Sequence, residues 1–176
     1  MIVETDRLIL RPYNFKYIND YYSLMSDHLV WGYSTIIPHE NILQSEQKLR
    51  EIIAQYADGF IGFHALFRKD GNIFIGEAGI LSFDDEANKC VIGYNLLPDF
   101  WRKGYATEIS ESLIEYAFAE LHIERIEALA LKSNTASCKV LEKSGMHLEG
   151  VLRHFTKIRG AYEDVCYYSI IRSDYV

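Results

Sequence analysis

The stretch Trp101-Arg102-Lys103-Gly104-Tyr105-Ala106-Thr107-Glu108 joins a predicted strand, Cys90 to Leu97, to a helix predicted from about Lys103 to Leu121. Pro98 and Asp99 end the strand just before it. A strand that enters a helix through such a turn makes an anion site, because unpaired N–H groups and the positive end of the helix dipole point at the ligand. The turn also carries two cations, and its small residues let a ligand approach the backbone. We expect a pyrophosphate here, although helix capping alone explains such a turn at least as well.

Length and composition indicate one globular domain spanning residues 1–176. The chain has a mass of 20.4 kDa, with 49% hydrophobic and 14% aromatic residues, which excludes disorder. Its net charge of −7 and pI near 5.4 argue against nucleic acid or an anionic membrane as a partner. An acidic surface weakly favours a cationic substrate such as an amine.

The cysteines and the N-terminus predict a reduced, cytoplasmic protein. Cys90, Cys138 and Cys166 are odd in number, widely spaced, and lack the spacing of metal ligands, so we expect neither a disulfide framework nor a metal site. The first residues lack the features of a signal peptide, and no apolar run is long enough to span a bilayer.

Hydrophobic periodicity predicts an α+β fold built on a mixed α/β sheet, in the order βααβββαβαββ. Three central strands should form an antiparallel meander that is apolar on both faces. Pro38 is expected in the first turn of the second helix. The predicted strands are 3–11, 60–68, 73–83, 89–97, 123–131, 146–153 and 164–171, and the predicted helices are 14–27, 38–57, 103–121 and 134–144.

A second strand-to-helix turn, Asn134-Thr135-Ala136-Ser137, begins the short helix. Asn134 is a natural N-cap, so by itself this turn is structural. Two such turns on neighbouring strands, however, can splay apart and open a cleft for a ligand. Lys139 and Lys143 could complete a phosphate site there, although a solvated helix face explains them equally well.

Several segments, in this order and spacing, carry a family resemblance: Thr5 to Arg11; Ile92 to Leu96 with Pro98 and Trp101 to Glu108; Asn134 to Ser137 with Val140 to Met146; and Gly160, Asp164-Val165 and Tyr168-Ser169. Together they resemble the GNAT superfamily of acyl-CoA N-acyltransferases. Within it, the likeness is to the RimJ/RimL-type branch, which includes ribosomal-protein N-terminal acetyltransferases. The resemblance implies a GNAT-like fold with a splayed central sheet. It also implies acetyl-CoA as cosubstrate and direct attack of a primary amine on the thioester.

The resemblance further implies where the cofactor binds. Backbone groups of Asn95, Leu96 and Leu97 should hold the thioester and the pantetheine arm. Asn134 should contact the pantetheine or an ordered water. From their places in the same helix, we expect Ser137 and Lys139 to contact the cofactor as well. The pyrophosphate should bind the N–H groups of Arg102, Lys103, Gly104, Tyr105, Ala106 and Thr107.

The catalytic candidates are Ser137 and Glu77. Many GNAT enzymes carry a tyrosine acid seven residues after the motif asparagine, where this chain has Leu141. In the RimJ/RimL-type branch a serine at the position of Ser137 is the alternative. Glu77 lies in an apolar run, where burial would raise the pKa of a base. A carboxylate in solvent beside Gly76 is the competing interpretation.

Other polar and aromatic residues have simpler explanations. His64 is expected to be a satisfied histidine of the sheet, the carboxylates of Asp84, Asp85 and Glu86 are expected in solvent, and Tyr94 lines either the cleft or the core. The segment between Asp27 and Pro38 should shape the acceptor pocket.

The acceptor itself is left open by the sequence. It is a protein or peptide N-terminus, or else a small amine such as a polyamine, aminoglycoside or amino acid. A non-catalytic CoA-binding sensor on the same fold is a further alternative. We expect a monomer or a homodimer.

Overall fold

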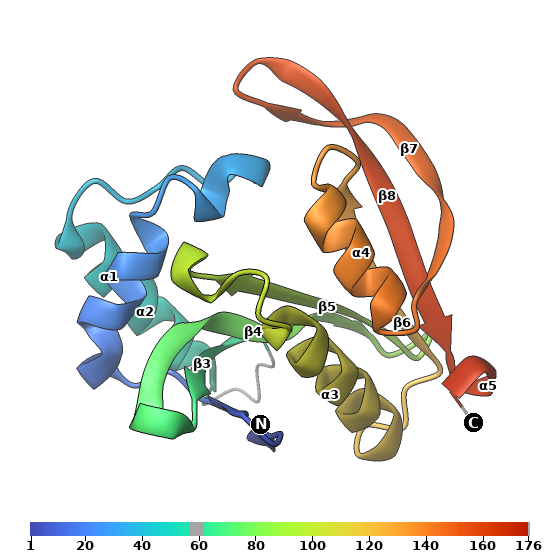
Figure 1. Cartoon of the computed structure of the whole chain (residues 1–176), viewed down its shortest axis with the longest axis horizontal. Coiled ribbons are helices and arrows are strands. Elements are labelled where there is room, and N and C mark those ends of the chain that lie inside the picture. The colour runs from blue at the N-terminus through green and yellow to red at the C-terminus, as the bar shows by residue number, and fades with distance from the viewer. Residues whose placement is uncertain (57–61, 176) are drawn as a thin grey trace.

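A computed structural model describes residues 1–56 and 62–175. Its strands form an eight-stranded sheet in the order β1-β2-β3-β4-β5-β6-β8-β7 (Figure 1). The strands are β1 (Val3–Glu4), β2 (Leu8–Arg11), β3 (Gly62–Arg68), β4 (Ile73–Asp84), β5 (Lys89–Leu96), β6 (Arg125–Leu131), β7 (His147–Ile158) and β8 (Ala161–Ile171). The α-helices are α1 (Ile18–Met25), α2 (Ile42–Tyr56), α3 (Tyr105–Ala119), α4 (Thr135–Lys143) and α5 (Arg172–Tyr175).

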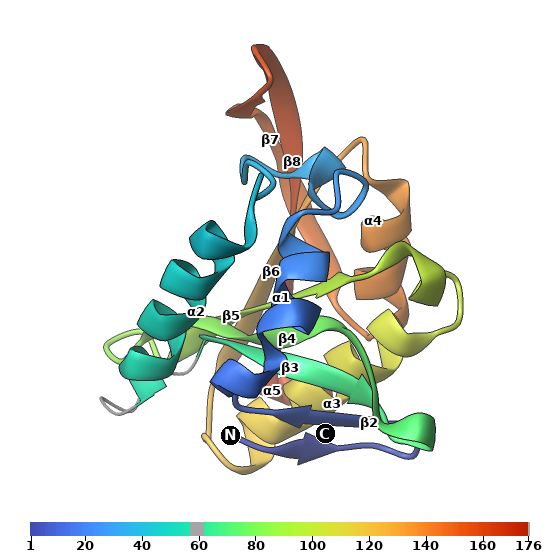
Figure 2. The ribbon, with the colours of Figure 1, turned by 90° about the vertical axis from the view of Figure 1, so that its left-hand side faces the viewer.

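The predicted α+β class and the central meander are confirmed. Strands β3, β4 and β5 pair antiparallel in sequence order, whereas β5 and β6 pair in parallel. Strand β8 then lies between β6 and β7, antiparallel to both. Figure 2 shows the β7–β8 hairpin projecting beyond the rest of the sheet.

The sheet is splayed between β5 and β6. These strands pair only from Lys89 to Val91 on β5 and from Arg125 to Glu127 on β6. Strand β5 nevertheless continues to Leu96, and β6 to Leu131, so their carboxyl ends separate. We call this opening the splay. Helices α3 and α4 follow β5 and β6, so both predicted turns lie at its two sides (Figure 1).

Two apolar cores hold the sheet between two helical layers. One core joins the sheet to α3 and α4 through residues such as Ile80, Ile109 and Leu141. The other joins it to α1 and α2 through residues such as Tyr21, Leu49 and Phe67. The meander therefore has helices on both faces, which explains why its strands are apolar throughout.

The N-terminal segment differs from the single strand predicted over 3–11. It forms two short antiparallel strands, β1 and β2, joined by a tight turn. The hydroxyl of Thr5 accepts a hydrogen bond from Leu8 N at 2.8 Å, and Thr5 N donates to Leu8 O at 3.0 Å. Periodicity missed this turn because threonine is also a good strand residue.

The second helix begins at Ile42, so the prediction that Pro38 lies in its first turn is wrong. Asn41 Oδ1 accepts from Gln44 N at 3.3 Å and caps the helix instead. The backbone before the cap turns inward, where His39 N donates to Met25 O at 2.9 Å. The predicted end of this helix at Ala57 and the predicted strand start at Phe60 lie outside the described residues.

Other element boundaries move by a few residues. Helix α3 begins at Tyr105 rather than Lys103, and the first predicted helix divides into a short 3₁₀ turn, Phe15–Tyr17, followed by α1. The last two strands are longer than predicted, but the turn at Arg159 and Gly160 between them is confirmed. In the described ranges, no helix combines the length and apolar character needed to cross a membrane.

Candidate active site

The turn after β5 has the geometry of an anion site. We call residues 101–107 the anion turn. Gly104 adopts a left-handed φ of 81°, and Arg102 does so at 59°. Glu108 N makes the first helical bond, to Gly104 O at 3.0 Å. The N–H groups of Tyr105, Ala106 and Thr107 precede that bond, so they have no partner within the helix and face the helix N-terminus.

The β1–β2 turn clamps the anion turn from the other side. Arg7 Nε donates to Glu108 Oε2 at 2.6 Å, and Arg7 Nη1 donates to Lys103 O at 3.1 Å. The Thr5 hydroxyl also donates to Glu108, and the Arg7 guanidinium lies 4.7 Å from the centre of the Tyr105 ring. Partial burial opposes ionisation of Glu108, but bonds from Thr5 and Arg7 outweigh it and lower its pKa. Sequence reasoning missed this clamp because its partners are about a hundred residues apart.

The end of β5 offers one backbone donor to the splay. Leu97 N donates to Ile75 O of β4 at 2.9 Å. Because antiparallel strands alternate, Asn95 also directs its backbone groups to β4, whereas those of Leu96 point away, toward the splay. The carbonyl of Leu96 accepts from Trp101 Nε1 at 2.7 Å. Of the three predicted backbone contacts, the N–H of Leu96 is the one aimed at the opening.

The second turn places a pair of hydroxyls at the splay. Asn134 Oδ1 accepts from Ser137 N at 3.1 Å, which confirms Asn134 as the N-cap of α4. The Ser137 hydroxyl lies 2.9 Å from the hydroxyl of Tyr94 on β5. Leu141, at the position of the missing tyrosine, is only 4% exposed and packs in the core. The sequence predicted that Tyr94 lines either the cleft or the core, and its bond to Ser137 makes it a candidate residue of the site.

The predicted cationic residues lie on the surface near these turns. Arg102, Lys103 and Lys139 are all exposed, so each is free to reach toward a phosphate. The ammonium of Lys103 lies 5.6 Å from the centre of the Phe100 ring.

Glu77 is buried on the other face of the sheet. Its side chain is 3% exposed, so the interpretation that placed its carboxylate in solvent is wrong. It accepts from Tyr13 at 2.9 Å and from Asn95 Nδ2 at 2.9 Å. Burial raises the pKa of Glu77 to about 7, and the bonds from Asn95 and Tyr13 offset part of the increase.

The backbone around Glu77 is irregular. Gly76 has a φ of 149° at a bulge in β4, and a Cβ there would lie 2.1 Å from Asn95 O. Only glycine fits this close approach of β4 and β5.

The two candidate catalytic groups therefore approach the splay from opposite faces. Tyr94 and Leu96 pack with the α3–α4 core, on the side of Ser137. Glu77 and Asn95 point the other way, toward Tyr13 and the α1–α2 layer. A thioester lying in the splay would expose its sulfur to the hydroxyls and its carbonyl carbon to an amine arriving from the α1–α2 side.

Other predicted residues take the expected structural roles. His64 is 1% exposed, its Nδ1 lies 2.9 Å from Gly62 O, and burial lowers its pKa to about 4. The carboxylates of Asp84, Asp85 and Glu86 are exposed. Among the residues that the structure describes, no group of three or more His, Cys, Asp or Glu could hold a metal ion.

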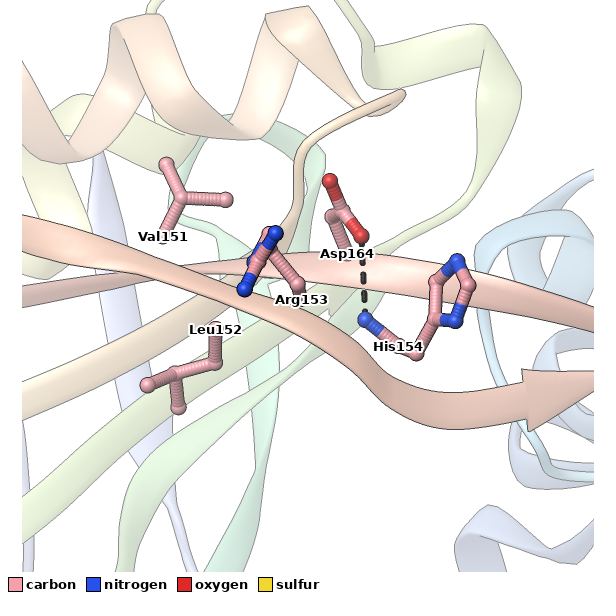
Figure 3. A pocket seen from close by; sticks show the side chains of 5 residues that line it. All are labelled: Val151, Leu152, Arg153, His154 and Asp164. Carbon is pink, nitrogen blue, oxygen red and sulfur yellow. Dashed lines mark hydrogen bonds between the residues drawn. The ribbon is translucent and has the colours of Figure 1, made fainter.

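A hollow of about 660 Å³ lies on the projecting hairpin (Figure 3). Its lining comprises Val151, Leu152, Arg153, His154 and Asp164. Residues 153–155 bulge opposite Asp164, whose carboxylate accepts from His154 N at 3.0 Å. This hollow contains neither hydroxyl of the pair nor Glu77, so we place the chemistry at the splay.

Comparisons with known proteins agree with this geometry. Residues 7–147 match the family model described as an acetyltransferase (GNAT) domain. An uncharacterized N-acetyltransferase, p20, of Bacillus licheniformis is 31% identical over 171 residues, which is 97% of this chain and 96% of that protein. A GNAT-family acetyltransferase structure from Bacillus anthracis has a TM-score of 0.87 at 25% identity and covers 98% of this chain and 99% of its own.

A third likeness, to a structure of a ribosomal L7/L12 α-N-protein acetyltransferase, RimL, in complex with coenzyme A, has a TM-score of 0.86 at 20% identity. It covers 97% of this chain and 98% of its own. These matches show an acetyl-CoA-dependent N-acetyltransferase. The chain belongs to the GNAT acetyltransferase superfamily.

Proposed function

We propose that this enzyme acetylates the α-amino group of a protein or peptide, in the manner of the RimJ/RimL-type branch. The observation that carries the proposal is the buried Glu77, whose pKa of about 7 suits a base for such an amine. An α-amino group has a pKa of roughly 7.7–8.0 and a lysine side chain about 10.4, so an N-terminus loses its proton more readily. The likeness to a ribosomal L7/L12 α-N-protein acetyltransferase supports the same acceptor class.

The segment over the acceptor side supports a peptide rather than a polycation. Residues 29–37 carry no charged side chain, and Leu29, Tyr33, Ile36 and Ile37 are exposed. Figures 1 and 2 place this segment, between α1 and α2, at the end of the molecule from which the β7–β8 hairpin projects. An uncharged, partly apolar rim fits the first side chains of a peptide better than it fits a polyamine.

The proposed mechanism divides the reaction between the two faces of the sheet. The anion turn would hold the pyrophosphate of acetyl-CoA, with charge added by Arg102 and Lys103, and the backbone of Leu96 would hold its pantetheine arm. Glu77 accepts the proton of the amine through a water or the Tyr13 hydroxyl, because the carboxylate itself is buried. The Leu96 N–H stabilises the carbonyl oxygen as charge develops, and Ser137 donates to the leaving thiolate. In this proposal, one N-acetyltransferase domain spans residues 1–176.

A thiol-release assay tests the proposal. The protein is incubated with acetyl-CoA and a panel of peptides with free N-termini, N-terminally blocked peptides that contain lysine, polyamines, aminoglycosides and amino acids. We expect release only with free N-termini. A small cationic amine is the second candidate, since the chain has a net charge of −7. Faster thiol release with polyamines or aminoglycosides than with free N-termini would contradict the N-terminal acceptor and identify a small cationic amine instead. Tight CoA binding with no release over the whole panel would indicate a sensor.

A further inference from the structure

Ser137 makes one hydrogen bond through its backbone N–H and another through its hydroxyl. Its N–H donates to Asn134 Oδ1 at 3.1 Å, which fixes the first turn of α4. Its hydroxyl lies 2.9 Å from the Tyr94 hydroxyl. These two hydroxyls come from β5, on one side of the splay, and from α4, which follows β6 on the other side. The pair therefore bridges the opening at the α3–α4 face.

Tyr94 brings its phenol to the splay from β5, whereas a tyrosine seven residues after Asn134 would come from α4. At that α4 position Leu141 is buried in the core and offers no hydroxyl. Tyr94 packs against the same core, with its ring among apolar side chains and its hydroxyl on Ser137. The Tyr94 hydroxyl bonds to a side chain in the first turn of α4, the helix that follows the other strand of the splay, rather than to a carbonyl of the core.

We propose that Tyr94 is a positioning residue that orients the Ser137 hydroxyl toward the cofactor sulfur, so that the two hydroxyls form a hydrogen-bonded chain ending on the leaving thiolate. The inference deepens the proposed function and rests on the role that it gives to Ser137. Each hydroxyl carries one proton. When Tyr94 donates to Ser137 Oγ, the Ser137 proton is left to point at the sulfur.

The chemical step needs no proton from Tyr94. The amine nitrogen forms a bond to the acetyl carbon, the C–S bond breaks, and its electron pair goes to sulfur. The thiolate is stabilised by the hydrogen bond from Ser137 and takes a proton from water. Burial raises the pKa of Tyr94 to about 12, with the Ser137 bond offsetting part of the increase, so the phenol remains a donor throughout.

The deciding experiment compares CoA with desulfo-CoA by titration calorimetry at about pH 9.5, where a thiol of ordinary pKa near 8.5 is ionised. The wild type should bind CoA about tenfold more tightly than desulfo-CoA, as expected for a hydrogen bond to a charged group. Tyr94→Phe should bring the ratio close to one and leave the affinity for desulfo-CoA unchanged. Tyr116→Phe, which removes a hydroxyl from α3, is the matched control and should keep the wild-type ratio.

Equal weakening of CoA and desulfo-CoA by Tyr94→Phe, or an unchanged ratio, would overturn the inference in favour of a purely structural tyrosine. This measurement uses no acceptor, so it decides the role of Tyr94 even if no amine is ever acetylated. With an acceptor in hand, Tyr94→Phe should lower kcat without raising KM for acetyl-CoA. In the double variant, Tyr94→Phe should add nothing to the loss of kcat caused by Ser137→Ala. Additive losses of kcat would contradict the hydrogen-bonded chain of the two hydroxyls.

Discussion

Replacement of Glu77 by glutamine tests the centre of the proposed mechanism. The substitution keeps the shape of the side chain and an oxygen that accepts from Tyr13 or Asn95, but it removes the basic carboxylate. General base catalysis contributes about 10²- to 10⁴-fold to a rate, so Glu77→Gln should lower kcat by about that factor. Acetyl-CoA affinity should stay within about twofold, because Glu77 lies on the face away from the hydroxyl pair.

The pH dependence gives this prediction its sharpest form. The wild-type rate should rise with pH through about 7, where the buried carboxyl loses its proton, and Glu77→Gln should lose that limb. The same group affects stability in the opposite direction. Its pKa lies above the ordinary value of 4.5 in the folded protein, so the folded state binds more protons between 4.5 and about 7. Stability therefore falls as pH rises through that window.

The magnitude follows from the two pKa values. The interval from 4.5 to about 7, at about 1.4 kcal/mol per pH unit, corresponds to about 3 kcal/mol lost by pH 8. Glu77→Gln avoids the cost of the buried charge, so its stability relative to wild type should improve by up to that amount between pH 4 and pH 8. Urea unfolding at both pH values measures the change, and thiol release over the same range measures the rate.

Asp84→Asn is the matched control, because Asp84 is an exposed carboxylate at the end of the same strand. It should change neither the pH–rate profile nor the pH dependence of stability. A Glu77→Gln enzyme that keeps the limb near pH 7 and most of its rate would refute Glu77 as the base. A stability difference that does not vary with pH would refute the perturbed carboxyl itself.

Three further substitutions address the cofactor side. Gly104→Asp should abolish measurable CoA binding in calorimetry, because it puts a side chain on a left-handed backbone and an anion against the pyrophosphate; undiminished affinity would remove the anion turn as the site. Ser137→Ala should lower kcat about tenfold with little change in KM for acetyl-CoA, which carries no thiolate before the reaction, and an unchanged rate would exclude Ser137 from the chemistry. Arg7→Lys should raise KM for acetyl-CoA several-fold with kcat nearly constant, since a single ammonium does not reproduce the separate guanidinium donors to Glu108 and Lys103 O. A fall in kcat alone would contradict a clamp on the anion turn.

The sequence by itself determined the elements whose signals are local. Apolar runs that alternate with turn residues predicted the meander, and Asn134 predicted the start of α4, where the structure finds an N-cap. The order of motifs also gave the superfamily. Boundaries failed where a side chain competes with the backbone, as at Thr5 and Asn41, because periodicity does not register such local bonds.

The tertiary structure decided what depends on contacts between distant segments. The sequence allowed Glu77 either in solvent or in the interior. The α1–α2 layer and Tyr13 cover it in the folded protein, and that burial raises its pKa. Arg7 meets Glu108, and Tyr94 meets Ser137, only because the sheet order brings those segments together. The anion turn could be predicted from the sequence because the N–H groups at a helix start depend on local structure. Its clamp and the hydroxyl pair across the splay could not be predicted, because packing between distant segments makes both.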